Sequence, residues 1–369
     1  MIEFRSMNSS FKKIGFFSAL ILPVLLIAGY YIGGLGIFSI HLFVFLLVPI
    51  MDFLIDRDRT NIAKEAVSDV AKERFYRWVT YGWVYVQMVV LFWGFHVVSS
   101  DLLTPVQWIG IISGMGLITG GIGITVAHEL GHKNTRLQQF YAKILLMTVC
   151  YMHFFIEHNR GHHVRVATIE DPATSREGEH FYAFWLRSIR DGYRSAWHLE
   201  GKRLEKKSER FWSIRNQMFP FTILPLVFVG LVFGFFSLWQ DRIVWEVLLL
   251  FFGQSLVAIS LLEAVNYLEH YGMERKKLPN GFYEKVTPLH SWNASQRVSN
   301  FLLFQLQRHS DHHAFAHKPY QVLNHYEESP QLPAGYSAMI LVAFIPPIWF
   351  AMMDPRLEAW KTKSRLSVQ

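Results

Sequence analysis

Long apolar stretches alternate with polar segments along the chain, on a scale larger than the helices of a water-soluble core require. Six apolar runs of about 20 residues are each long enough to cross the roughly 30 Å hydrocarbon core of a bilayer as a helix. They cover residues 14–32, 37–55, 78–98, 108–126, 219–239 and 244–265. The pattern therefore predicts an all-α integral membrane protein with six transmembrane helices.

Three other segments carry a different pattern. Residues 140–156 are apolar but short, and histidine motifs flank them on both sides, so we expect a buried or re-entrant helix. Residues 56–77 mix acidic and basic residues at helical spacing, which predicts one solvated amphipathic helix. Residues 336–353 contain two adjacent prolines and are expected to lie at the membrane interface. No internal repeat or linker divides the chain, so we expect a single domain over residues 1–369.

The distribution of basic residues predicts the orientation of these helices. The connections at residues 33–36, 99–107 and 240–243 contain one basic residue, Arg242, of the 36 in the chain. Because Lys and Arg concentrate on the cytoplasmic side of membrane proteins, both termini and the polar segments are expected to form a cytoplasmic cap. This predicts a bacterial-type inner (plasma) membrane protein. It also explains the net charge of +7 without a nucleic acid partner.

Composition narrows the chemistry further. The chain is 51% hydrophobic and contains 31 Phe and 12 Trp, which is unusual for a soluble protein. Its one cysteine, Cys150, excludes a disulfide framework and any paired-cysteine metal site. Metal ligands in this chain would therefore be nitrogen and oxygen atoms.

Nine of the 17 histidines fall in four short motifs. In LQRHSDHH, which ends at His313, the three histidines are spaced i, i+3 and i+4 and share one face of a helix, as metal ligands would. The other motifs are HELGH, EHNRGHH and NYLEHYG. The nine residues are His128, His132, His158, His162, His163, His270, His309, His312 and His313.

The number of imidazoles restricts the metal. HELGH fits the HExxH pattern of zinc proteases, but that site needs one further ligand and leaves six histidines unexplained. Nine nitrogen donors suit two metals of higher coordination number, and iron combines such numbers with O₂ chemistry. A metal transporter is a third hypothesis, although its ionisable residues would lie at mid-bilayer in broken helices. Glu129 directly follows a motif histidine, and Glu157 and Glu269 directly precede one. All three are expected to fix imidazole tautomers, with a water-mediated bridging role open to one of them.

The motifs HELGHK, EHNRGHH, NYLEHYG and LQRHSDHHA, in that order, resemble those of the alkane 1-monooxygenase (alkane omega-hydroxylase) family. These are integral-membrane non-haem di-iron enzymes related to membrane fatty-acid desaturases and xylene monooxygenase, and the resemblance covers residues 52–360. It implies terminal hydroxylation of medium- to long-chain n-alkanes to 1-alkanols with O₂. Electrons would pass from NADH through a rubredoxin reductase to rubredoxin. A desaturase or an aromatic side-chain hydroxylase stays an alternative, and an intramembrane HExxH zinc protease is a remote one.

The resemblance also implies roles for particular residues. The nine histidines would hold two iron ions (Fe²⁺/Fe³⁺), and Asp171 in DPATS would bond a ligand histidine, beside Glu129 and Glu269 as candidate catalytic residues. The chain ends at Gln369 without a cysteine pair, so rubredoxin is expected to be a separate protein that docks near Arg275, Lys276 and Lys277. Candidates for lining the alkane channel are Phe43, Leu46, Phe92, Leu261 and Leu262.

Overall fold

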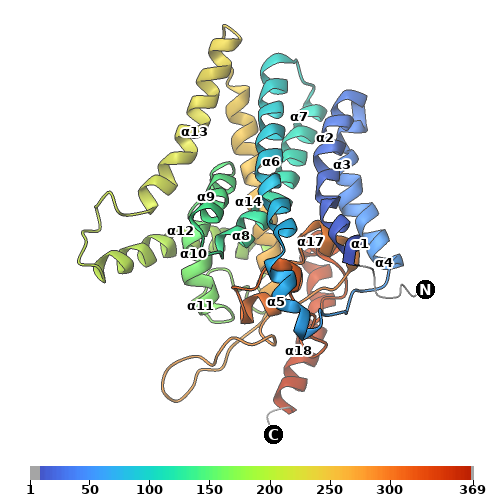
Figure 1. Ribbon diagram of the computed structural model, residues 1–369, viewed down its shortest axis with the longest axis vertical. Coiled ribbons are helices and arrows are strands. Elements are labelled where there is room, and N and C mark those ends of the chain that lie inside the picture. Colours follow the sequence, from blue (N-terminus) through green and yellow to red (C-terminus); the bar gives the residue numbers. More distant parts are fainter. Residues whose placement is uncertain (1–8, 367–369) are drawn as a thin grey trace.

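The computed structural model describes the backbone of residues 9–366 and the side chains of residues 12–363 (Figure 1). Helices make up its regular structure, and the described residues contain only two isolated β-bridges. Six helical segments are long and apolar enough to cross a membrane: Lys12–Ile32, Gly34–Leu54, Arg74–Ser100, Pro105–Gly131, Met218–Trp239 and Glu246–His270. This confirms the predicted all-α fold and its six spans. The single domain predicted over 1–369 stays a prediction, and residues 1–8 and 367–369 lie outside the described part.

Three of the six spans are single helices and three are built from consecutive helical segments. The single helices are α6 (Arg74–Ser100), α13 (Met218–Trp239) and α14 (Glu246–His270). The composite spans consist of α1 (Ser9–Gly15), η1 (Phe16–Leu20) and α2 (Ile21–Ile32); of η2 (Gly34–Phe38), α3 (Ser39–Leu42), η3 (Phe43–Leu47) and α4 (Val48–Leu54); and of α7 (Pro105–Gly116), η4 (Leu117–Ile124) and α8 (Thr125–Gly131). Segments η3 and η4 are π-helical.

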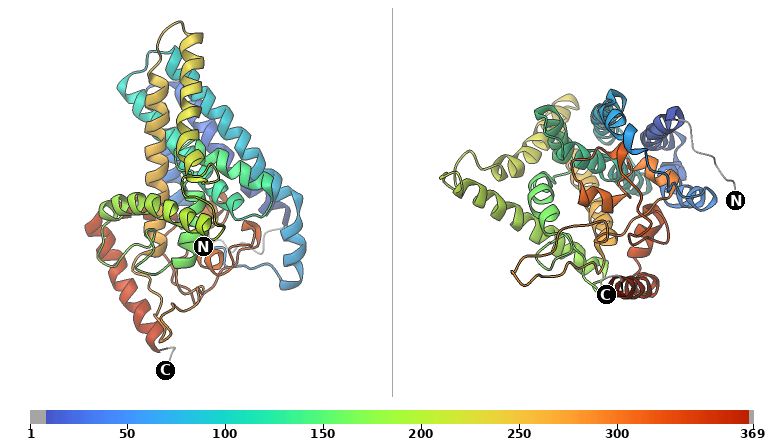
Figure 2. Two further views of the ribbon diagram at one scale, coloured as in Figure 1. Left: turned by 90° about the vertical axis from the view of Figure 1, so that its left-hand side faces the viewer. Right: turned by 60° about the horizontal axis from the view of Figure 1, so that its bottom comes forward.

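The remaining helices gather toward one end of the bundle, opposite the three short connections between spans (Figures 1 and 2). We call this part the cap. It contains α5 (Lys64–Lys72), α9 (Arg136–Met147), α10 (Phe154–Glu157), η5 (His158–His162), α11 (His163–Arg165), α12 (Phe181–Glu205), α15 (Arg297–Leu302), α16 (His309–Ala314), η6 (Tyr320–Val322), α17 (Tyr336–Ala343) and α18 (Pro346–Leu366).

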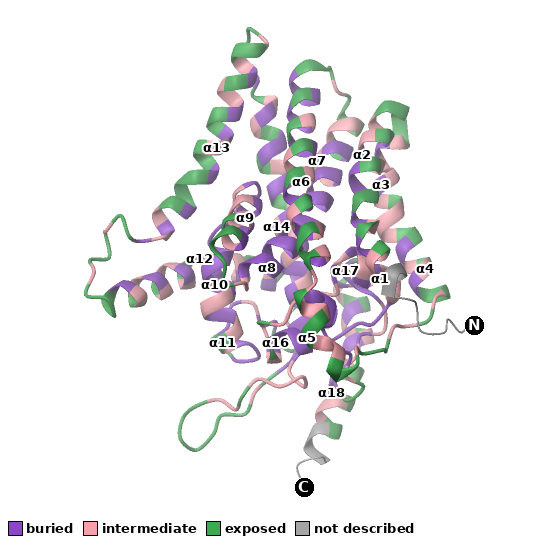
Figure 3. Ribbon diagram, in the orientation of Figure 1, coloured by how far each residue is buried: buried purple, intermediate pink, exposed green. Residues whose placement is uncertain are grey.

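The spans differ in how much protein surrounds them, as Figure 3 shows. In the fourth span, Pro105–Gly131, 78% of the most apolar window is buried, whereas the value for α13 is 28%. The apolar side chains that α13 exposes include Leu231 and Leu238. In a membrane protein such side chains face lipid, so α13 lies at the edge of the bundle and the fourth span at its centre. The central span leads directly into the first histidine motif.

The prediction of one amphipathic helix over residues 56–77 is wrong. Only α5 (Lys64–Lys72) is helical before α6 begins. The residues ahead of α5 are tied to the cap instead: the Asp58 amide donates to the Ser295 carbonyl over 2.8 Å, and the Arg308 guanidinium donates to the carbonyl oxygens of Asp58 and Thr60. These bonds satisfy backbone groups that a helix would pair internally, so the segment stays extended.

Residues 140–156 do not form a span, in agreement with the prediction. Helix α9 ends at Met147, and a turn with Cys150 at a φ of 53° separates it from α10. The apolar stretch 336–353 is divided between α17 and α18, whose axes differ by 118°. The bend occurs at residues 344 and 345, directly before the two prolines that begin α18.

Candidate metal centre

The nine motif histidines converge at the boundary between the spans and the cap. His128 lies on α8 and His132 directly follows it, so both belong to the cap end of the central span. His270 is the last residue of α14. The other six lie on η5, α11 and α16. Their ring nitrogens form two groups, one of five residues (His128, His132, His158, His163 and His312) and one of four (His162, His270, His309 and His313), and within each group the facing atoms lie within 4.8 Å of one another.

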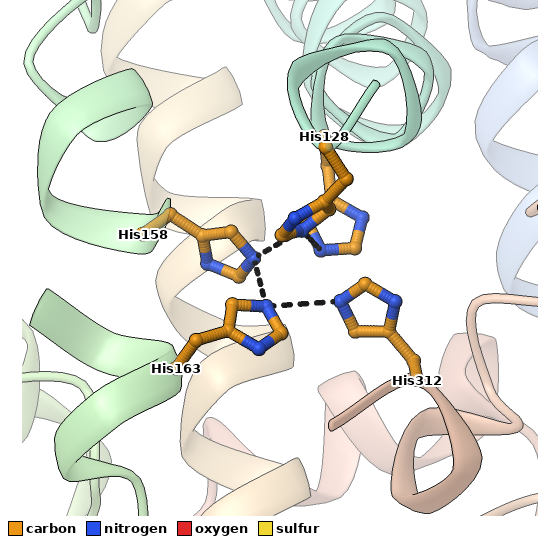
Figure 4. Close-up of side chains that lie close together, drawn as sticks. His128, His158, His163 and His312 are labelled. Carbon is orange, nitrogen blue, oxygen red and sulfur yellow. Dashed lines mark hydrogen bonds between the residues drawn. The ribbon is translucent and has the colours of Figure 1, made fainter. Parts of the chain in front are cut away.

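The five-histidine group forms a chain of close Nε2 contacts. The Nε2 of His132 lies 3.3 Å from that of His128 and 3.1 Å from that of His158. His163 Nε2 lies 3.0 Å from His158 Nε2 and 3.1 Å from His312 Nε2. Figure 4 labels four of these imidazoles, His128, His158, His163 and His312, which approach one another from three parts of the chain. The arrangement thus places five ring nitrogens around one small volume.

The four-histidine group lies beside it and is buried throughout. His313 Nε2 lies 3.2 Å from His162 Nε2 and 2.8 Å from His309 Nε2. His309 Nε2 is in turn 3.2 Å from His270 Nε2. All three contacts involve the Nε2 atoms of both rings, so these four imidazoles also point inward.

Hydrogen bonding among imidazoles cannot explain this geometry, but metal binding can. A neutral imidazole Nε2 either donates one hydrogen or accepts one through a single in-plane lone pair, yet His158 Nε2 has two close nitrogen neighbours. Two nitrogens bound at right angles to a metal at about 2.1 Å lie about 3 Å apart. Burial, and then the neighbouring imidazoles, lower the pKa of His132, His312 and His313 well below its usual value. Their lone pairs are therefore available, and the donor set fits two metal ions.

A π-helical turn distributes the second motif between the two groups. In an α-helix, residues five apart point to different faces, but η5 is π-helical and brings residues five apart into line. His158 and His163 therefore belong to the five-histidine group. His162, next to His163 in sequence, points into the other group and approaches His313.

The motif LQRHSDHH is divided in the same way, although its spacing places the three histidines on one face of a helix. His309 and His313, four residues apart on α16, belong to the four-histidine group. His312 belongs to the other group and approaches His163. Helix α16 therefore lies between the two groups and supplies both.

Asp171 lies where the sequence predicts, against a histidine of the site. Its Oδ2 is 2.8 Å from His162 Nδ1, and the Thr174 hydroxyl donates to the same oxygen over 2.6 Å. Burial alone would raise the pKa of the Asp171 carboxyl, but the His162 imidazole and these hydrogen bonds lower the pKa to about 2. The carboxylate thus stays ionised, holds the hydrogen of His162 on Nδ1 and leaves the Nε2 lone pair directed into the group.

Glu269 approaches the Nε2 atom of His309, which faces the four-histidine group, and not the Nδ1 atom on the other side of the ring. One carboxyl oxygen lies 3.0 Å from His309 Nε2, and the other accepts a hydrogen bond of 2.6 Å from the Tyr336 hydroxyl. Glu269 is thus close enough to the four-histidine group to contact a metal ion bound there. Tyr336 carries no sequence signal, because it lies 67 residues from its partner in an apolar stretch.

Glu129 and Glu157 pair with basic residues. Glu129 forms a 2.8 Å ion pair with Lys133 and accepts a hydrogen bond from the Tyr320 amide. Glu157 forms a 2.6 Å ion pair with Arg165. Both carboxylates contribute to the packing of the cap around the histidines, and their role in fixing imidazole tautomers stays a prediction.

An apolar cavity extends from the spans to the histidines. It reaches both groups, since His128, His158 and His309 line it together with Glu269. Its apolar walls include Leu22, Val44, Phe45, Leu117, Ile124, Leu261, Leu262, Val265, Leu302 and Ile340. Leu261 and Leu262 were expected there. The prediction is wrong for Phe43, Leu46 and Phe92, which lie outside this lining. Leu46 and Phe92 are exposed, and Phe43 packs against the core elsewhere.

The fold and site define a class of membrane protein that the comparisons identify. Residues 102–343 match the model of the fatty acid desaturase family. At higher similarity, the chain is 41% identical to alkane 1-monooxygenase 2 of Pseudomonas aeruginosa, over 86% of this chain and 83% of that protein. It is 40% identical to alkane 1-monooxygenase 2 of Alcanivorax borkumensis, over 87% and 82%. The hydroxylase component of a xylene/toluene monooxygenase from Pseudomonas putida is 26% identical over 70% of this chain and 67% of its own length. This chain belongs to the alkane 1-monooxygenase family.

Proposed function

We propose that this protein hydroxylates the terminal carbon of medium- to long-chain n-alkanes to give 1-alkanols, using O₂, two non-haem irons and electrons from a reduced rubredoxin. The observation that carries the proposal is the apolar cavity that ends at both histidine groups. It connects a region suited to a lipid-soluble substrate with a site suited to redox metals. Relatives named alkane 1-monooxygenase support the choice of substrate.

In this proposal, the bound metals and the residues of the chain have different roles in the reaction. Bound iron supplies the activation of O₂ and the oxidation of the C–H bond. The nine imidazoles hold the metals, Asp171 orients His162, and Tyr336 orients Glu269 at the end of the cavity. The narrow apolar walls exclude water and hold an alkyl chain so that its end approaches the histidines.

Two alternatives use the same site. A desaturase would act on an internal bond of the substrate, and an aromatic side-chain hydroxylase would act on a benzylic methyl group. The 26% identical xylene/toluene relative favours the aromatic side-chain hydroxylase. A HExxH zinc protease would need Glu129 as its base, but this carboxylate is paired with Lys133, and both motif histidines share a group with three further imidazoles.

Metal analysis of the purified protein tests the proposed cofactor. We expect about two irons per chain, because the two groups are separate and each supplies four or five nitrogen donors. One zinc and no iron would overturn the assignment.

Product analysis tests the reaction. The protein, reconstituted with rubredoxin, its reductase and NADH, is incubated with mixed n-alkanes from octane to hexadecane and the products are identified by mass spectrometry. We expect 1-alkanols. Exclusively subterminal alcohols or alkenes would contradict terminal positioning in the cavity.

The third test concerns the docking site of the electron donor. We place this site at the basic hairpin, residues 275–285, which projects from the cap (Figure 1). Arg275 ties the hairpin to the site, because its guanidinium donates to the carbonyl oxygens of Val164 and Val166, next to His163. Lys276 and Lys277 are exposed. Rubredoxins are acidic as a class, so the double variant K276E/K277E should raise the rubredoxin concentration needed for half-maximal turnover and leave iron content unchanged.

The matched control is K206E/K207E, which reverses two exposed lysines at the end of α12. Turnover with limiting rubredoxin should also fall as salt rises, since screening weakens steering. If K276E/K277E behaves as the wild type at low salt, or if the control is equally impaired, the donor docks elsewhere.

A further inference from the structure

The central span contains an unusual number of glycines, and most of them have a packing reason. A Cβ atom added at Gly114 would lie 2.6 Å from the Leu26 side chain, and one at Gly116 2.4 Å from Val257. At Gly120 it would lie 2.5 Å from the backbone of Ala258, and at Gly123 2.1 Å from Gln87. These glycines let neighbouring helices approach closely, as small residues do in membrane proteins.

Gly121 has no such reason. A Cβ atom added there would meet nothing within 4 Å, and its φ is not in the left-handed region. A helix is more stable with alanine than with glycine at a position that offers room, so neither packing nor backbone geometry explains this glycine. What distinguishes Gly121 is that the open space beside it is the apolar cavity.

Gly121 lies part of the way along the cavity, between the histidines and the end of the cavity farthest from them. Gly121, Thr125 and His128 are spaced i, i+4 and i+7, and all three line the cavity. At a rise of 1.5 Å per residue, the Gly121 backbone lies roughly 10 Å from that of His128. Leu117, one turn further from the histidines, also lines the cavity, so the open space continues past Gly121.

We infer that the absent side chain at Gly121 is a determinant of substrate length. An alkyl chain whose end lies at the histidines passes Gly121, and the missing Cβ leaves room for the part of a long chain that extends toward Leu117. A larger side chain here would occupy the space that Gly121 leaves open in the cavity and would shorten the part available to an alkyl chain. This inference rests on the proposed alkane substrate.

The test compares G121A and G121L with the wild type on octane, dodecane and hexadecane. Each methylene excluded from an apolar pocket costs a substantial factor in specificity, so G121L should lower the ratio of hexadecane to octane turnover by roughly tenfold or more, and G121A by less. Hexadecane turnover should fall more than octane turnover, and iron content should stay close to the wild-type value. Stabilisation against thermal unfolding by added 1-hexadecanol, relative to 1-octanol, should fall in parallel and reports binding without turnover.

The matched control is G230L, at an exposed glycine of α13 where an added Cβ also meets nothing within 4 Å. It should leave the length profile unchanged. A wild-type profile in both G121A and G121L, with iron retained, would overturn the inference while the proposed function stands. A wild-type protein that forms no 1-alkanol from any alkane would overturn the proposed function itself. If G121L does not fold, the ratio of hexadecane to octane turnover in G121A tests the inference instead.

Discussion

A single hydrogen bond decides what the imidazole of His162 can do. Asp171 lies 2.8 Å from Nδ1 and fixes the ring hydrogen there, so Nε2 presents its lone pair to the four-histidine group. The Thr174 hydroxyl orients the carboxylate in turn. Such partners of metal ligands commonly affect metal affinity by 10- to 100-fold, so Asp171 should influence one group much more than the other.

We therefore expect D171N to lower the affinity of the four-histidine group for iron by about 10- to 100-fold. The amide keeps the shape of the side chain but loses the charge that orients His162. Iron retained per chain against a graded chelator series should fall from about two toward about one. D191N is the control, because the Asp191 carboxylate pairs with the exposed Arg190 on α12, and this variant should retain iron as the wild type does. Equal retention in both variants would exclude the orienting role of Asp171.

At the scale of elements, the contact between η4 and α14 holds the central span in place. Both glycines line the cavity, but a Cβ atom added at Gly120 would lie against the backbone of Ala258, whereas one at Gly121 would meet nothing within 4 Å. Two adjacent glycines of one helix thus have opposite surroundings, and the same substitution should have opposite consequences.

G120A should destabilise the protein by about 1–3 kcal/mol, because the added methyl group would come within 2.5 Å of Ala258 and force η4 away from α14. G121A should be neutral or stabilising by at most about 1 kcal/mol, because alanine favours the helix and has room. Thermal unfolding midpoints of the two variants in one detergent provide the comparison. A lower midpoint for G121A than for G120A would contradict the packing described for this span.

The sequence predicts elements better than it predicts their contacts. The apolar runs give all six spans to within a few residues, because membrane crossing depends on local composition. The nine histidines are likewise recognisable as a cluster. Their division is not, because it depends on a π-helical turn at His158 and on α16 lying between the groups, and both result from long-range packing. Tyr336 and the extended backbone around Asp58 depend on distant partners in the same way.

The whole molecule is strongly asymmetric along the bundle axis. All nine histidines, the ion pairs around them and most basic residues belong to the cap end, while the opposite end consists of three short connections (Figure 2). By the positive-inside rule, the cap should face the cytoplasm, where NADH-derived electrons are available.

Cysteine labelling tests this orientation. In a C150S background, L102C in the connection between α6 and α7 should react with a membrane-impermeant maleimide in intact spheroplasts, because Leu102 is fully exposed. N280C, in the basic hairpin, should react only after the membrane is opened. The reverse pattern would place the cap outside, and the proposed donor could not then reach the site from the cytoplasm.

The order of the histidines along the chain has a consequence for biogenesis. By residue 163 the ribosome has supplied four members of the five-histidine group but only His162 of the other. Both groups remain incomplete until α16 is made, since His312 and His313 are their last members. All six spans precede that point. The spans can therefore enter the membrane before either group is complete, and loading of the proposed metals would be a maturation step of an already inserted protein.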